Sequence, residues 1–284
     1  MPTPPDLPVA LLANPDSGRG EGPEAECILR ERGAKVLRFT LDRAAEAAQS
    51  GAARIVVAGG DGSIGCAAEV AASAGVPLAV VPVGTANDFA RALGIPLDPA
   101  EACRLAVAGA NTRRLELAWI GSRPFVNAAS AGLSPIAARK AGGLKRILGP
   151  LAYTAGALRA GLRARPIACR VSCERNSFFD GRAWQVSVAV TGAFGGGASV
   201  EADPHDGRLD VVVIEARSRG RLVAHAYRLR TGRVESQRGV RSRRCRDLEV
   251  RTDGETGFNV DGELFDARDA RFRVEAGAFE VVTG

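Results

Sequence analysis

The sequence predicts a doubly wound α/β domain followed by a β-rich domain. Up to Asn111, short apolar runs alternate with alanine-rich segments of helical length, which is typical of a doubly wound, Rossmann-like parallel sheet. Beyond that point apolar and polar residues often alternate, as in 185–188, which indicates antiparallel strands with one wet face. We therefore expect an α/β domain over 1–118 and an antiparallel, sandwich-like domain over 119–284, whose last strand could pack back on the first domain.

Composition limits the class of protein. The chain has 284 residues, of which 46% are hydrophobic, enough for two domains with sizeable cores. A net charge of +6 favours anionic partners. The six cysteines form no CxxC pair, which favours free buried thiols in a reducing compartment. Residues 1–8 do not resemble a signal peptide and no apolar run reaches the ~18 residues of a membrane span, so we expect a cytoplasmic protein.

Apolar runs and glycine stops define the elements of the first domain. Gly33, Gly51 and Gly94 each follow a predicted helix, as glycines do at helix C-termini, and Ser63 and Asp98 are predicted N-caps. Strands are predicted at 9–13, 35–40, 54–58 and 77–83, and helices at 23–32, 41–50, 64–74, 88–93 and 99–108.

The pattern of apolar and polar residues changes near Asn111, and we expect a hinge between the two domains around 111–125. Pro135 and Gly149 delimit two predicted helices, and an arginine-rich run covers 228–246. Strands are predicted at 113–120, 124–128, 167–173, 184–191, 209–215, 248–251, 272–275 and 279–282, and helices at 134–145 and 150–164.

Three glycine-bearing turns, at 14–20, 59–63 and 84–88, follow predicted parallel strands. Because ligands of such sheets bind at the carboxyl ends of the strands, these turns predict one shared site. The turn at 59–63 leads into a helix, an arrangement that presents main-chain N–H groups to a phosphate. Asp61 repels an anion, so its expected partner is a metal ion, a water or a proton. The alternative for one such turn alone is a plain βα turn with a solvated Asp61.

These motifs together resemble the diacylglycerol kinase catalytic family, the soluble lipid kinases that include bacterial diacylglycerol kinases, YegS-like kinases and sphingosine kinases. The resemblance rests on Asn14-Pro15 with Gly18, on Gly59-Gly60-Asp61-Gly62-Ser63 and on the segment 82–90. It continues through Gly195-Gly196-Gly197, the segment 202–210 and Asp261-Gly262-Glu263. A lone GGDG sequence is unspecific, whereas the ordered set covers nearly the whole chain.

The resemblance implies transfer of the γ-phosphoryl group of ATP to a lipid hydroxyl with Mg²⁺, in a cleft between the two domains. Asp61, Asp88 and Glu116 are then the expected Mg²⁺ ligands, directly or through water. The family has threonine at Ser63 and commonly aspartate at Glu116. Alternatives are a plain strand end at Thr40 and a solvent-facing Glu116. The implied nucleotide-binding residues are Asn14, Ser17, Gly18, Thr40, Gly59, Gly60, Asp61, Gly62, Ser63, Gly84, Thr85 and Asn87.

Glu263 matches the family's proposed general base, and Asp61 is the second catalytic candidate. Glu263 has apolar neighbours in sequence, so we expect a desolvated carboxylate suited to accept a proton; the alternative is a simple β-turn. We predict that Asp61→Ala and Glu263→Ala abolish turnover and leave the fold intact. Asp203, Asp206 and Arg208 match a second, structural metal site built mainly from main-chain carbonyls, although a type I′ turn at Asp206-Gly207 is an equally good account.

The expected partners are a lipid substrate and, transiently, an anionic membrane surface. The helices at 134–148 and 150–162 could flank an acyl pocket, or could be ordinary amphipathic helices with solvated arginines. We expect no nucleic-acid partner because the arginine run has no interleaved aromatic residues; a homodimer and the identity of the lipid stay open. The other candidate functions are an NAD kinase and a non-catalytic nucleotide- or lipid-binding protein. Basic residues in or directly after these two helices are Arg139, Lys140, Lys145, Arg146, Arg159, Arg163 and Arg165.

Overall fold

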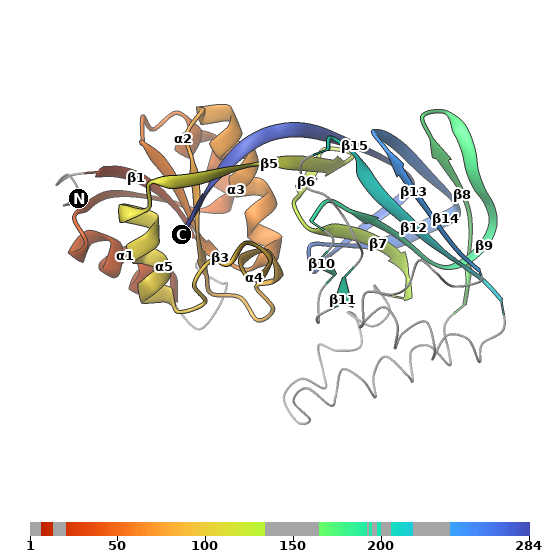
Figure 1. Cartoon of the computed structure of the whole chain (residues 1–284), viewed down its shortest axis with the longest axis horizontal. Coiled ribbons are helices and arrows are strands. Elements are labelled where there is room, and N and C mark those ends of the chain that lie inside the picture. Colours follow the sequence, from red (N-terminus) through yellow and green to blue (C-terminus); the bar gives the residue numbers. More distant parts are fainter. Residues whose placement is uncertain are drawn as a thin grey trace, which may run out of the picture.

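The computed structural model describes residues 7–13, 21–133, 165–191, 193–194, 198–199, 206–217 and 239–284. Two lobes stand side by side, an α/β lobe formed by the first part of the chain and a β-rich lobe formed by the rest (Figure 1). Several predictions lie outside the described residues. These are the turn at 14–20 with Asn14, Ser17 and Gly18, the helices at 134–145 and 150–164, the glycines at 195–197, Asp203, and most of the arginine-rich run.

The first lobe is a parallel sheet in the order β2-β1-β3-β4. Strands β1, β3 and β4 carry no polar alternation because helices cover both faces, whereas buried and exposed residues alternate at the start of the edge strand β2. The strands are β1 Leu7–Ala13, β2 Ala34–Phe39, β3 Arg54–Gly59 and β4 Leu78–Pro82. The helices are α1 Glu21–Glu31, α2 Ala44–Ala48, α3 Asp61–Ala74, α4 Asp88–Leu93 and α5 Pro99–Ala108, with a 3₁₀ turn, η1 Leu41–Arg43.

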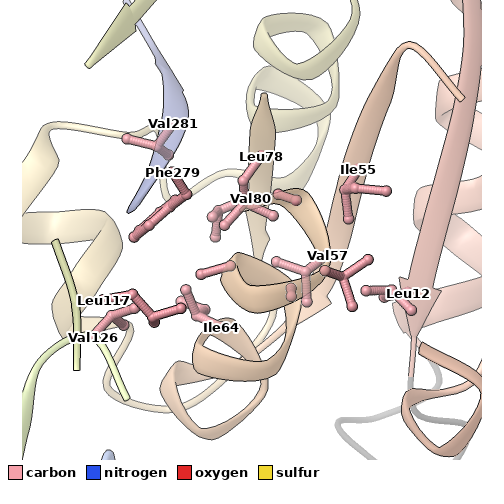
Figure 2. Packing of buried hydrophobic residues seen from close by; sticks show 14 of the residues in the cluster. Leu12, Ile55, Val57, Ile64, Leu78, Val80, Leu117, Val126, Phe279 and Val281 are labelled. Carbon is pink, nitrogen blue, oxygen red and sulfur yellow. The ribbon is translucent and has the colours of Figure 1, made fainter. Parts of the chain in front are cut away.

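Successive side chains of each central strand enter opposite cores. Leu12, Ile55, Val57 and Leu78 pack against the α3 side, where Ile64 joins them (Figure 2). Their neighbours along the strands, among them Leu11 and Val56, pack with residues of α1 and α5. The doubly wound α/β arrangement predicted from sequence is therefore confirmed for this lobe.

Two local predictions in this lobe need correction. Ser63 does not cap α3, because the helix begins at Asp61 directly after the extended N-cap residue Gly60, and Ser63 lies inside the first turn. The helix predicted at 41–50 is a 3₁₀ turn followed by the short α2. By contrast Asp98 caps α5 as predicted, since its Oδ1 accepts the N–H of Glu101 at 2.9 Å.

The second lobe is mostly antiparallel. Both β7 and β8 pair with β9 and with β14, so the long strands close around one apolar core into a sandwich-like body. The strands are β5 Asn111–Ile120, β6 Arg123–Phe125, β7 Ala128–Gly132, β8 Ile167–Cys173, β9 Asn176–Ala189, β12 Leu209–Glu215, β13 Val240–Cys245, β14 Asp247–Val260 and β15 Glu263–Thr283, with a small pair, β10 Ala193–Phe194 and β11 Ala198–Ser199.

One strand joins the lobes. β15 starts beside β14 in the second lobe, runs antiparallel to β5, and ends parallel to β4, where Val281 pairs with Leu78 (Figure 1). The sequence predicted two short strands here, at 272–275 and 279–282, because the register shift between Glu275 and Phe279 interrupts the alternation. Through β15 the sheets of the two lobes form one continuous sheet. This strand therefore fixes the position of one lobe relative to the other.

The strand predicted at 124–128 is divided. β6 ends at Phe125 and β7 begins at Ala128, so Val126 and Asn127 belong to neither strand. Their main-chain N–H groups bind the carboxylate of Asp261 and not a neighbouring strand.

The cysteines are free, as predicted, but not all are buried, since Cys27 is exposed. In the second lobe the Sγ atoms of Cys173 and Cys245 lie 2.6 Å apart. Among the residues that the structure describes, no helix combines the length and apolarity needed to cross a bilayer.

Candidate functional site

Two glycine turns meet at the carboxyl ends of β3 and β4. The main chains of Gly60 and Gly84 are in contact, and a Cβ on residue 60 would lie 3.2 Å from the Cα of Gly84. The first turn leads directly into the 14-residue helix α3, whose first main-chain N–H groups have no acceptor one helical turn earlier, although that of Ser63 donates to the carbonyl of Gly60 at 3.0 Å. Gly84 and Thr85 are exposed beside it. This rim can therefore present main-chain N–H groups to an anion such as a phosphate.

Thr40 lies at the same edge of the sheet, after the outer strand β2. It is the N-cap residue of η1 and makes no side-chain capping bond. A side-chain hydrogen bond to Thr40 is the main cause that lowers the pKa of Asp42. Thr40 is thus on the predicted rim, two strands away from the glycine turn at 59–63.

Asn87 shapes the second turn from within. It adopts a left-handed conformation with φ 51°, its Oδ1 accepts the N–H of Gly84 at 3.0 Å, and its amide donates to the carbonyl of Gly84 at 3.0 Å. The side chain is buried and bound to its own loop. The amide of Asn87 therefore holds the shape of the turn at 84–87.

Asp61 caps a helix other than its own. Its Oδ2 accepts the N–H of Asp88 at 3.1 Å, and its Oδ1 accepts the N–H of Phe89 at 2.9 Å, which are the first two amides of α4. A carboxylate at this position also matches the positive end of the helix dipole. Burial, and then the nearby charge of Asp61, raise the pKa of Asp88. A cation between these two carboxylates would relieve that repulsion.

A buried amide links Asp61 to the second lobe. Asn127, which is 4% exposed, donates from Nδ2 to Oδ1 of Asp61 at 3.2 Å, while its own Oδ1 accepts the hydroxyl of Thr191 at 2.9 Å. Asn127 belongs to none of the motifs recognised in the sequence and was not among the predicted site residues. Its position after a short strand offered no signal, because its partners lie 66 and 64 residues away.

Asp261 organises the same segment from the other side. Its carboxylate accepts the main-chain N–H groups of Val126, Asn127 and Ala128 at 2.8 to 3.0 Å. Burial raises the pKa of Asp261 to about 7, a shift that these three hydrogen bonds oppose. The Asp-Gly-Glu motif thus begins with a structural carboxylate.

Glu263 lies directly over the glycine turn. A Cβ on Gly62 would lie 2.5 Å from its Oε1 and 2.9 Å from its Cγ. Its Oε2 forms an ion pair with Nη2 of Arg123. The side chain is 58% exposed, so the expectation that its apolar neighbours in sequence would desolvate it is wrong. Adjacent residues of a strand alternate between its faces, and Leu264 is itself 42% exposed.

Glu116 is buried between β5 and the turn at Asp206-Gly207. It is 1% exposed, which excludes the solvent-facing alternative, and its Oε1 accepts the N–H of Gly207. It thereby connects β5 to the turn before β12. In the part of the chain that the structure describes, no group of three His, Cys, Asp or Glu side chains is arranged to hold a metal ion.

The turn at Asp206 is held by side chains. Asp206 accepts the N–H of Arg208 at 3.0 Å and forms an ion pair with Arg244 at 2.8 Å. Gly207 has φ 69°, the left-handed conformation that a type I′ turn needs at its second central residue.

Comparison with known proteins identifies the family. The diacylglycerol kinase catalytic domain model matches residues 8–120, and the YegS C-terminal NAD kinase beta sandwich-like domain model matches residues 127–283. The chain belongs to the YegS-like diacylglycerol kinase family. Members of this family are lipid kinases. A "Probable lipid kinase YegS-like" from Pseudomonas putida is 34% identical over 247 residues, covering 84% of this chain and 79% of that protein.

Other relatives agree. A protein of the same description from Stenotrophomonas maltophilia is 31% identical over 271 residues, covering 90% of this chain and 85% of that protein. The crystal structure of a diacylglycerol kinase from Bacillus anthracis superposes with a TM-score of 0.69 at 18% identity, covering 98% of this chain and 97% of that one. Yeast NADH kinase complexed with NADH has a TM-score of 0.51 at 13% identity, covering 99% and 84%. Both likenesses show the shared fold.

Proposed function

We propose that this YegS-like lipid kinase transfers the γ-phosphoryl group of ATP to the hydroxyl of a lipid, with Mg²⁺. The observation that carries the proposal is the contact between Glu263, from the second lobe, and Gly62, in the glycine turn of the first. Phosphoryl transfer requires a bound phosphate chain, charge neutralisation and an oriented nucleophile. The glycine turn supplies the first, and a carboxylate beside it can accept the proton of an incoming hydroxyl.

The nucleotide is proposed to lie along the carboxyl ends of the parallel strands. Main-chain N–H groups of 59–63 and the turn at 84–87 would hold the phosphates, with Thr40 further along the rim. Asn14, Ser17 and Gly18 are proposed to complete the pocket from the third turn.

Asp61 and Asp88 are the side chains that fit Mg²⁺, since they are two neighbouring carboxylates beside a phosphate site. The raised pKa of Asp88, caused by burial and by Asp61, is the observation that favours a cation there. Because Asp61 already accepts three hydrogen bonds, its contact with Mg²⁺ is proposed to run through water. Glu116 is bound to Gly207 and would join only through water. Bound Mg²⁺ would neutralise the charge of the transferred group.

The lipid is proposed to approach Glu263 from its exposed side. A transient contact with an anionic membrane would deliver the substrate, since the chain carries a net charge of +6.

The test offers the purified protein γ-labelled ATP, Mg²⁺ and separate vesicles containing diacylglycerol, a sphingoid base or a lipid extract, with NAD as a further acceptor. We expect label in a lipid product, identified by mass spectrometry, and a loss of at least 100-fold in Glu263→Gln. The control Arg170→Ala breaks another surface ion pair, to Asp180 in the β8–β9 hairpin, and should be fully active. Label in NAD alone, or in no acceptor, would overturn the proposal.

A further inference from the structure

The five residues 123–127, here called the connecting segment, contact the two candidate catalytic carboxylates, Asp61 and Glu263. The segment comprises β6 and the two residues before β7. Arg123, at its start, pairs with Glu263, and Asn127, at its end, donates to Asp61. Neither residue belongs to a motif recognised in the sequence. One short segment therefore holds the two side chains on which the proposed function depends.

Arg123 is held more firmly than the carboxylate it binds. Its side chain is 28% exposed against 58% for Glu263, and its guanidinium stands over the ring of Phe265 at 6.0 Å from the centroid. Next to it the carbonyl of Pro124 packs on α3, where a Cβ on Gly65 would lie 2.6 Å away. An exposed glutamate has many rotamers, so a fixed cation beside it selects the one that lies over Gly62.

The other end of the segment is fixed by buried hydrogen bonds. The main-chain N–H of Asn127 donates to Asp261, its carbonyl accepts the N–H of Val190, and its side chain lies between Asp61 and Thr191. Because the side-chain amide of Asn127 donates one hydrogen bond and accepts another, it cannot rotate without leaving a buried group unpaired. The orientation of the Asp61 carboxylate is thereby tied to the second lobe.

We propose that Arg123 and Asn127 are positioning residues, which hold Glu263 over the glycine turn and Asp61 on α4. This inference deepens the proposed function and rests on it for its kinetic consequences. An exposed ion pair adds little to stability, so the contribution of Arg123 is geometric. A misplaced catalytic group lowers the rate of the chemical step without changing the affinity for ATP.

The first experiment compares Arg123→Ala, Arg123→Lys, Glu263→Gln and the double variant Arg123→Ala/Glu263→Gln, with Arg170→Ala as the control. We expect kcat of Arg123→Ala to fall about 100-fold, with KM for ATP and the midpoint of thermal unfolding little changed. Lysine should restore part of kcat, because it keeps the charge but lacks the planar guanidinium. In the Glu263→Gln background the alanine should cost nothing further. Full kcat in Arg123→Ala, or additive losses in the double variant, would overturn the role of Arg123.

The second experiment measures amide hydrogen exchange in the same proteins and in Thr191→Val, which removes the hydroxyl that holds Asn127. We expect faster exchange at residues 261–265 in Arg123→Ala and at the start of α4 in Thr191→Val, with unchanged rates elsewhere. Unchanged exchange at these sites would overturn the proposal. Because exchange needs no substrate, a wild-type protein that phosphorylates no lipid would refute the proposed function alone, and exchange would still decide the positioning roles.

Discussion

Gly60 and Gly84 bring two turns of the first lobe into main-chain contact. A Cβ on residue 84 would lie 2.5 Å from the Cα of Gly60 and 2.8 Å from Oδ1 of Asn87. β3 and β4 are neighbours in the sheet, so their following turns emerge side by side. Only residues without a side chain allow the two turns to form a common rim, which explains a glycine in each.

Gly84→Ala should therefore destabilise the protein. The new methyl group meets main-chain atoms that cannot move aside, and overpacking of this kind costs about 1–3 kcal/mol. We expect a lower urea midpoint and weaker binding of a fluorescent ATP analogue. Gly254→Ala is the matched control, because a Cβ there meets nothing within 4 Å. Equal stability of the two variants would contradict the packing argument.

Gly62→Ala should lower activity and leave stability almost unchanged. Its new methyl group meets the end of the Glu263 side chain, a flexible and exposed group that can swing away. The free energy of unfolding should change little, whereas phosphoryl transfer should fall as it does in Glu263→Gln. Chemical denaturation and the labelled-lipid assay on one preparation check both halves. Retained activity would show that the position of Glu263 over the turn is dispensable.

Asp261 predicts how stability depends on pH. Its pKa is raised from 3.8 in the unfolded chain to about 7 in the fold, so the folded state binds the proton more tightly. The contribution of Asp261 to the free energy of unfolding is therefore fully present below pH 3.8 and is lost as pH rises through about 7. Between pH 3.8 and about 7 the urea midpoint of the wild type should therefore fall relative to that of Asp261→Asn, whose side chain does not titrate. A wild-type midpoint that rises relative to the variant would mean that the three N–H donors outweigh burial.

The fold of the first lobe was predictable because three of its four apolar runs end at a glycine-bearing turn, and all alternate with alanine-rich helical segments. The second lobe was harder. β13 was missed because four of its six residues are exposed polar side chains, and β14 and β15 were predicted too short because register shifts interrupt their alternation. Strand pairing, not local pattern, determines these lengths.

The candidate site was predictable in its motifs and not in its contacts. Glycine spacing marked the two described turns, and the family resemblance marked Glu263. The partners of Asp61 could not be inferred, because they are main-chain groups 27 and 28 residues away and an amide from the other lobe. The ion pair of Arg123 could not be predicted for the same reason, since it forms only where β6 and β15 approach each other in the fold.

Asp61→Ala should lower stability as well as activity, although the sequence predicted an intact fold. Alanine leaves the N–H groups of Asp88 and Phe89 and the amide of Asn127 without their acceptor. The loss of a helix cap and of buried hydrogen bonds together costs about 2–4 kcal/mol. Asp61→Asn keeps one acceptor oxygen and should lose less. Urea denaturation of the two variants measures the difference.

Glu263→Ala separates this structural role from catalysis. Its side chain is exposed and its one ion pair lies at the surface, so the variant should unfold at the wild-type urea concentration while transferring no phosphate. Asp61→Ala, in contrast, should show faster amide exchange across α4, because the helix has lost the carboxylate that binds its first turn. Wild-type exchange in α4 would mean that water replaces the carboxylate without cost, and Asp61 would then return to a purely catalytic role.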